Sequence, residues 1–110
     1  MNIQQFYHKT FKKSTMYTIS HQLYLEVAER LWGAIGSKGY YSGSVIFTHE
    51  DVECRLTCTL FVERHSYAES EGRLGEISRI IPVWWEFHTT AGSEELLNDF
   101  SLKELLSIAL

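Results

Sequence analysis

Two of the five histidines lie two positions from a glutamate within predicted strands, which is the arrangement in this sequence most suited to chemistry near neutral pH. His65 follows Glu63 by two positions, and His88 follows Glu86 by two positions. A histidine with a carboxylate neighbour can act as a general base or a metal ligand. In an extended strand, however, alternate residues lie roughly 6.6 Å apart and their side chains stand parallel. The spacing therefore favours solvated residues on a sheet face over an enzymatic or metal site around His65 and His88.

The two cysteines, Cys54 and Cys58, are four positions apart within one alternating stretch. In a strand this spacing separates them by roughly 13 Å. A disulfide needs Cα atoms within about 7 Å, so the two thiols are too far apart for a bridge or for a shared tetrahedral metal. We expect buried, reduced thiols, which are typical of a cytoplasmic protein.

Glycines recur at positions 33, 36, 39 and 43, but no strand precedes them, so the pattern indicates a turn and a helix cap rather than a nucleotide fingerprint. The sequence also has no zinc-ligand spacing, nucleophile elbow or HExxH motif. We therefore expect no cofactor, and the sequence favours a non-enzymatic protein.

Residues Val52 to Tyr67 alternate strictly between apolar and polar types, which predicts a long strand with one buried face. The apolar positions are the even ones: Val52, Cys54, Leu56, Cys58, Leu60 and Val62. Residues 40–48 and 76–90 are rich in β-branched and aromatic types and predict the two flanking strands. A tight turn at His49-Glu50 is expected to join the first of them to the long strand and to pair Phe47 with Val52, which puts both buried faces on one side. In the second of these, the odd positions Ile77, Ile81, Val83, Trp85 and Phe87 are expected to face the core. Pro82 predicts an edge position or a bulge, because proline cannot donate to a strand ladder.

Helical spacing of apolar residues predicts a helix over residues 17–35, capped by Thr18 or Ser20 and ended by glycine. Ser101 and Glu104 form a capping box, which predicts a second helix starting at Leu102. Residues 93–98 are expected to form a short turn or helix before it. The order is α-β-β-β-α, and the predicted fold is a single α+β domain over residues 1–110. It consists of a three-stranded antiparallel β-meander with an N-terminal and a C-terminal helix on one face.

The face of the sheet away from the helices is unusually apolar for a surface in contact with water, which marks it as an interaction surface. The candidate interface residues are Phe61, Tyr67, Ile80, Trp84, Glu86 and His88. On that face, antiparallel pairing should bring Trp84, Glu86 and His88 beside Arg55, Thr57 and Thr59. We expect a second copy of the chain to cover this face. The alternatives are the aromatic, basic N-terminal arm (residues 1–15), or nucleic-acid bases stacked on the aromatic rings.

Charge is distributed unevenly along the chain. Residues 1–38 contain five Lys/Arg and two Glu, a net charge of +3, whereas residues 39–110 contain five Lys/Arg and twelve Asp/Glu, a net charge of −7. An acidic body repels phosphate backbones, so a nucleic-acid accessory role through Lys9, Lys12 and Lys13 is an alternative rather than the leading hypothesis. No apolar run is long enough to span a membrane, and we expect no membrane partner.

Overall fold

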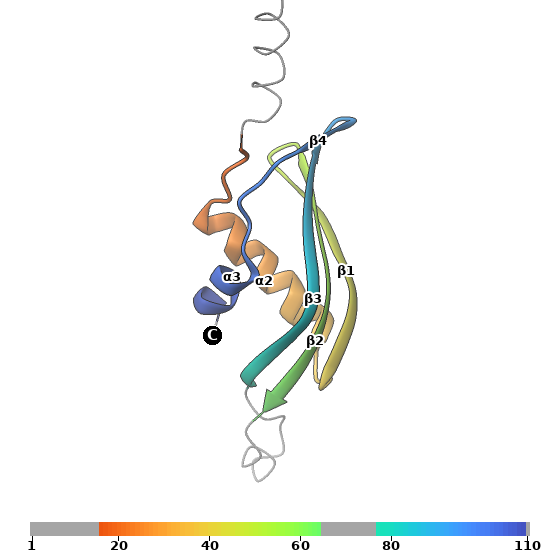
Figure 1. Cartoon of the computed structure of the whole chain (residues 1–110), viewed down its shortest axis with the longest axis vertical. Helices are drawn as coiled ribbons and strands as arrows, with labels where there is room; N and C mark the ends of the chain where they lie inside the picture. The colour runs from red at the N-terminus through yellow and green to blue at the C-terminus, as the bar shows by residue number, and fades with distance from the viewer. Residues whose placement is uncertain (1–15, 65–76, 110) are drawn as a thin grey trace, which may run out of the picture.

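The fold is a curved, four-stranded antiparallel sheet with two helices on its concave face (Figure 1). It is seen in a computed structural model that describes residues 16–64 and 77–109. The elements in chain order are α2 (His21–Ile35), β1 (Tyr40–His49), β2 (Val52–Arg64), β3 (Ile77–Ala91), β4 (Glu94–Leu96) and α3 (Leu102–Ala109). The strands lie in the order β1-β2-β3-β4. The predicted α+β arrangement, with helices on one face, is therefore confirmed.

The sheet has four strands, so the prediction of three was wrong. Residues 94–96, expected in a turn or helix, form β4, which pairs with β3 at Thr89–Ala91. A two-residue loop with Gly92 at φ 66° reverses the chain between the strands, and glycine adopts this conformation without steric cost. A three-residue strand is too short to show a recognisable period in the sequence.

Both helices begin where a serine hydroxyl can accept a free backbone N–H. Ser20 Oγ accepts from Leu23 N at 3.1 Å, and Ser101 Oγ accepts from Glu104 N at 3.3 Å. Helix α3 starts at Leu102 as predicted, whereas α2 starts at His21, later than the expected residue 17. Helix α2 ends at Gly36, whose φ of 57° suits glycine.

The core lies between the helices and the inner face of the sheet, with β2 at its centre. All six even positions of β2 from Val52 to Val62 are buried, which confirms the predicted inner face of this strand. From α2 the core receives Leu23, Tyr24, Val27, Ala28, Leu31 and Ile35. From the chain end it receives Phe100, Leu102 and Leu105. Phe100 stacks between Phe87 and Tyr24, at ring-centroid distances of 4.0 and 5.3 Å.

Strands β1 and β2 join through a two-residue turn, in which Glu50 and Asp51 have φ of 50° and 69°. Positive φ at both central residues is the requirement of a type I′ turn, which here forms without glycine. The predicted pairing of Phe47 with Val52 was wrong, because Phe47 pairs with Cys54 and His49 with Val52. The observed register differs from the predicted one by two residues, so the same side chains of β1 face the core.

A bulge in β3 exchanges the two faces of that strand. Thr59 pairs with Trp84 while Leu60 pairs with Pro82, which leaves Val83 as an extra residue. Before the bulge, Ile80 therefore points into the core and Ile81 points outward. The predicted inward positions of Ile81 and Val83 were wrong, because their exposed fractions are 37% and 60%. The prediction from Pro82 of an edge or a bulge was correct.

Replacing Leu105 with alanine should lower the free energy of unfolding by roughly 2–5 kcal/mol, because a fully buried leucine leaves a cavity that the core fills only in part. Urea unfolding measures the change. The control is Lys103→Ala on the exposed side of the same helix, which should change stability by less than about 0.5 kcal/mol. Equal effects of the two substitutions would show that α3 is not docked in the core.

Candidate interaction surface on the outer sheet face

The face of the sheet opposite the helices, here named the outer face, carries an apolar strip at one end. The strip consists of Tyr40, Phe61, Ile81 and Trp84, whose exposed fractions are 49%, 47%, 37% and 49%. Tyr40 is opposite Phe61 on the neighbouring strand, and their ring centroids are 5.1 Å apart. Phe61 is in turn opposite Ile81, so the strip runs across β1, β2 and β3.

Strand alternation and the bulge together assemble this strip. Tyr40 and Phe61 occupy outward positions because their neighbours Tyr41 and Leu60 pair on the core face. Trp84 is outward after the bulge and Ile81 is outward before it. If Val83 were paired opposite Leu60 instead of being an extra residue, Ile81 would face the core, and Trp84 would be the one member of the strip on β3.

On β1 and β2 the centre of the outer face is polar and uncharged, whereas on β3 Glu86 lies opposite Thr57. Ser42 Oγ and Thr59 Oγ1 lie 2.9 Å apart, and Ser44 Oγ and Thr57 Oγ1 lie 2.7 Å apart. These hydroxyl pairs link β1 to β2 across the sheet surface. Each side chain satisfies the other, so this part of the face can be desolvated at lower cost than a charged surface.

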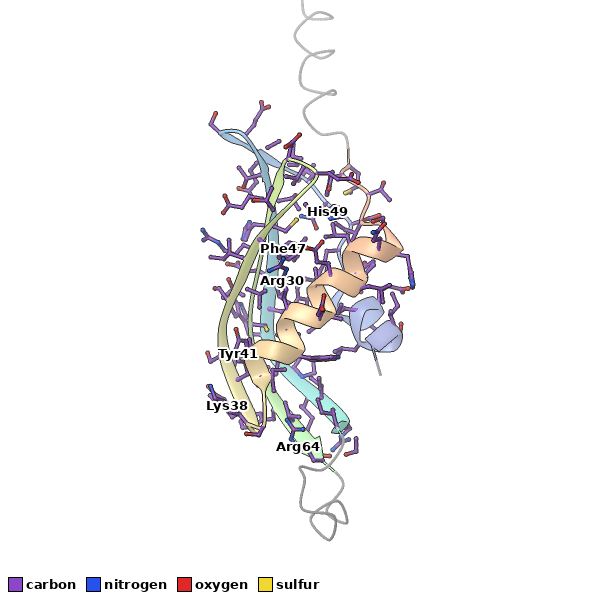
Figure 2. The ribbon with its side chains drawn as sticks, turned by 180° about the vertical axis from the view of Figure 1, so that it is seen from behind. Arg30, Lys38, Tyr41, Phe47, His49 and Arg64 are labelled. Atoms are coloured by element: carbon purple, nitrogen blue, oxygen red, sulfur yellow. The ribbon has the colours of Figure 1, made fainter. Side chains whose placement is uncertain are left out.

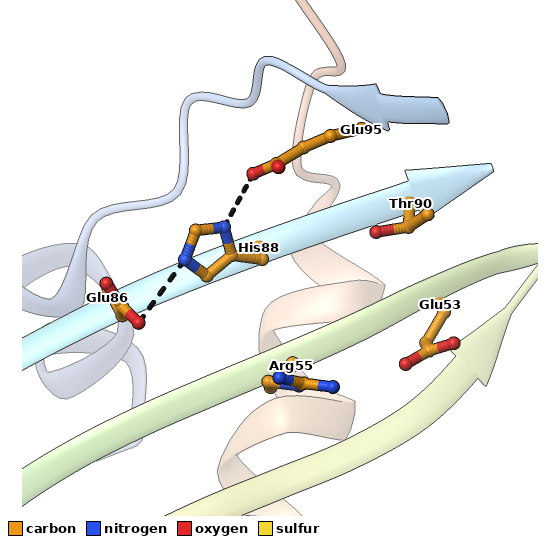
Figure 3. A pocket seen from close by; sticks show the side chains of 6 residues that line it. All are labelled: Glu53, Arg55, Glu86, His88, Thr90 and Glu95. Atoms are coloured by element: carbon orange, nitrogen blue, oxygen red, sulfur yellow. Dashed lines mark hydrogen bonds and ion pairs between the residues drawn. The ribbon is translucent and has the colours of Figure 1, made fainter. Parts of the chain in front are cut away.

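The far end of the outer face is a shallow, charged pocket of about 240 Å³ (Figure 3). It is lined by Glu53, Arg55, Glu86, His88, Thr90 and Glu95. His88 Nδ1 lies 2.6 Å from Glu95 Oε2 of β4, and His88 Nε2 lies 3.4 Å from Glu86 Oε2. The imidazole thus has a carboxylate at each nitrogen.

This arrangement favours a charge clamp between β3 and β4 over a catalytic base. The hydrogen bond from Glu95 raises the pKa of His88 above its usual value near 6.5; partial burial opposes this, and Glu86 adds to it. The two carboxylates favour the protonated imidazole, and in that form it has no free lone pair with which to accept a proton or bind a metal. Over residues 16–64 and 77–109, no group of three or more His, Cys, Asp or Glu is arranged to hold a metal ion.

The structure brings together most, but not all, of the residues predicted for the interface. The predicted pairing of Trp84, Glu86 and His88 with Thr59, Thr57 and Arg55 is confirmed. Ile80 was misplaced: its exposed fraction is 6%, and it lies in the core because the bulge reverses its side.

Several predicted residues fall outside the described part of the chain. These are Tyr67, His65 and the arm residues Lys9, Lys12 and Lys13. Conversely, Tyr40 and Ile81 belong to the strip but were not among the predicted interface residues. Tyr40 could have been found, because it has an even number in a strand whose odd positions face the core. Ile81 could not, because its side depends on the bulge.

The cysteines of β2 are free, fully buried and expected to be unreactive. Both have an exposed fraction of 0%. Burial raises the pKa of each thiol to about 11. The thiolate is the reactive form, so this environment suppresses nucleophilic and metal-binding chemistry at Cys54 and Cys58.

No protein-family model, curated protein or solved structure matches the chain. Neither helix in the described part of the chain is long and apolar enough to cross a membrane.

Replacing Glu95 with glutamine should lower the pKa of His88 toward 6.5, because the strongest contact with the imidazolium becomes neutral. An NMR titration of the imidazole resonances measures this pKa. The control is Glu94→Gln, which removes the same charge from the neighbouring position of β4 and should leave His88 nearly unchanged.

The same contact makes stability depend on pH. The folded pKa of His88 is raised, so its stabilising contribution is full below pH 6.5 and is lost as the pH rises through the raised value. The Glu95→Gln variant should show a smaller loss, because only Glu86 then raises the pKa of His88. If wild type and variant have parallel stability profiles across this window, the clamp does not contribute to folding.

Both thiols should resist a thiol-specific reagent in the native protein at pH 8 and react at once in denaturant, because burial blocks access and keeps them protonated. Mass spectrometry counts the modified cysteines in each condition. Rapid labelling of Cys54 or Cys58 without denaturant would contradict the buried, inert assignment.

Proposed function

We propose that this protein is a small, non-enzymatic protein–protein interaction module that self-associates through its outer face. The observation that carries the proposal is the apolar strip of Tyr40, Phe61, Ile81 and Trp84 on a face that the two helices leave open. Clustered exposed apolar residues are typical of interaction surfaces, whereas single ones are common everywhere.

The composition of the strip supports a protein partner. Tyrosine, tryptophan and phenylalanine are enriched at interfaces, and tryptophan and tyrosine are common among the residues that dominate binding energy. Beside the strip lie the hydroxyl pairs Ser42–Thr59 and Ser44–Thr57, and beyond them lie the charged residues of the pocket. An apolar patch bordered by polar groups is the usual organisation of such a surface.

Charge supports a second copy as the partner. The strip itself carries no charge, and Glu63 at its border is paired with Arg79 at 3.1 Å. Two copies can therefore place strip against strip without opposing like charges. The outer face carries Glu53, Glu86 and Glu95 at its other end, which disfavours phosphate backbones and argues against nucleic acid on this face.

The buried, reduced state of Cys54 and Cys58 supports a cytoplasmic location for this module. We include that location in the proposal.

Trp84→Ser and Phe61→Ser should each weaken self-association at least about thirtyfold, because each removes an aromatic anchor from both copies. Sedimentation velocity over a range of concentrations measures the dissociation constant. The control is Leu25→Ser on the exposed side of α2, since Leu25 and Phe61 have the same exposed fraction of 47%. The control should self-associate as the wild type does.

A wild-type protein that remains monomeric at several hundred micromolar would overturn the proposal. So would equal weakening by Leu25→Ser, which would indicate non-specific association of exposed apolar residues.

A further inference from the structure

The two edges of the sheet differ in how well they are protected from pairing with another strand. At the β3 side, the three-residue β4 covers the end of β3, and Asn98 Nδ2 donates to the carbonyl of Phe87 at 3.2 Å. Further along, Pro82 lacks an N–H, and register shifts distort the strand beside Ser78 and Val83. Short edge strands, proline and bulges are the devices by which proteins block edge pairing.

The β1 edge has none of these devices. Strand β1 pairs with β2 over its whole length without a register shift, and its sequence YYSGSVIFTH contains no proline, lysine, arginine or acidic residue. A long, regular and uncharged edge strand is a template for another strand.

The backbone groups along this edge can be assigned from the ladder. Val62 N donates to Gly39 O at 2.9 Å, so the odd residues that follow Gly39 bond to β2 and the even residues point their backbone groups away from it. The outward set is Tyr40, Ser42, Ser44, Ile46 and Thr48. Within the described ranges, no other strand pairs with this side of β1.

Contacts along β1 hold it in a shape ready for pairing. The guanidinium of Arg30 lies 4.6 Å from the ring centre of Phe47, and His49 Nδ1 lies 3.1 Å from Glu26 Oε1 of α2 (Figure 2). At the other end, the Arg64 side chain donates to the carbonyls of Gly36 and Lys38 at 2.8 and 3.2 Å. A template fixed in this way loses little conformational entropy on binding.

We infer that a second copy of this chain pairs with β1 through its own β1, antiparallel, with Ser44 opposite Ser44. This register is the one that pairs every outward residue, because Tyr40 then faces Thr48 of the second copy and Ser42 faces Ile46 of the second copy. No like charges meet along the strand.

Charge complementarity at both ends of the pairing selects a second copy over an unrelated strand. Continuing the register past the strand ends sets Lys38 against Glu50 of the second copy, and the two-fold symmetry repeats this pair at the other end. Lys38 is exposed, and the Glu50 side chain is 83% exposed, so both can move to meet their partners. Each chain thus supplies one cation and one anion at matching distances from the central serine.

This inference rests on the proposed self-association but uses a different surface. Tyr40 belongs to both surfaces and gains Thr48 of the second copy as a cross-strand neighbour, whereas pairing through β1 leaves Phe61, Ile81 and Trp84 of each copy free. The two outer faces then lie on the same side of one continuous sheet, and the strips can still contact further copies.

Amide hydrogen exchange by NMR tests the pairing directly, at one protein concentration that populates the assembly and at one that does not. We expect the amides of Tyr40, Ser42, Ser44, Ile46 and Thr48 to exchange at least tenfold more slowly in the assembly, with little change at the odd positions already bonded to β2. Self-association without this alternating protection would overturn the edge pairing and leave the outer-face proposal standing. A monomer at several hundred micromolar would overturn both.

Two lysine substitutions distinguish pairing at the β1 edge from association through the outer face. Ser44→Lys should abolish the alternating protection, because it opposes two lysines at the symmetry axis. The matched control is Thr57→Lys, which places the same charge on the same face and removes the same Ser44–Thr57 hydrogen bond, but one strand away from the edge. The control should retain the protection. Loss of protection in both variants would contradict pairing at the edge.

Discussion

The structure depends on β2 being hydrogen-bonded along both sides while its alternate residues pack in the core. Val52 to Val62 supply six buried side chains at even positions, so the direction of every odd side chain is fixed as outward. Both helices use the inner face, with α3 packed beside α2 (Figure 1). The described chain therefore has one protein layer on one side of the sheet and none on the other.

The bulge at Val83 determines which residues of β3 lie on the outer face. An odd insertion in a strand reverses which residues face the core, and here it gives Ile80 to the core and Ile81 to the outer face. The same distortion, with Pro82, makes β3 a poor template for another strand. One local irregularity thus extends the apolar strip and also protects one edge of the sheet. Strand β1, at the opposite edge, has no bulge and pairs regularly with β2.

The outer face changes from apolar to charged along the strands, and the two ends are suited to different tasks. The aromatic end loses little by leaving water, since it has no charges to desolvate. The charged end holds its groups in internal contacts, with His88 between Glu86 and Glu95. The contact between His88 and Glu95 joins β3 to β4, so it stabilises the short strand that covers this edge. The proposed contact surface and the structural clamp therefore lie at opposite ends of one face.

The sequence alone determined the features that depend on neighbouring residues. Alternation identified the buried face of β2, and the capping box located the start of α3, whereas Ser20 was one of two candidate caps for α2. The spacing of the strands was enough to pair Trp84, Glu86 and His88 with the correct residues of β2. These features are local, because side-chain period and capping are set within a few positions. Tertiary structure decided the rest: the presence of β4, the register of β1, and the side of the sheet on which Ile80 and Ile81 lie. Each of these depends on which backbone groups of a distant segment are available for hydrogen bonding. A bulge changes that pairing, and the alternation of apolar and polar residues around it does not reveal the change.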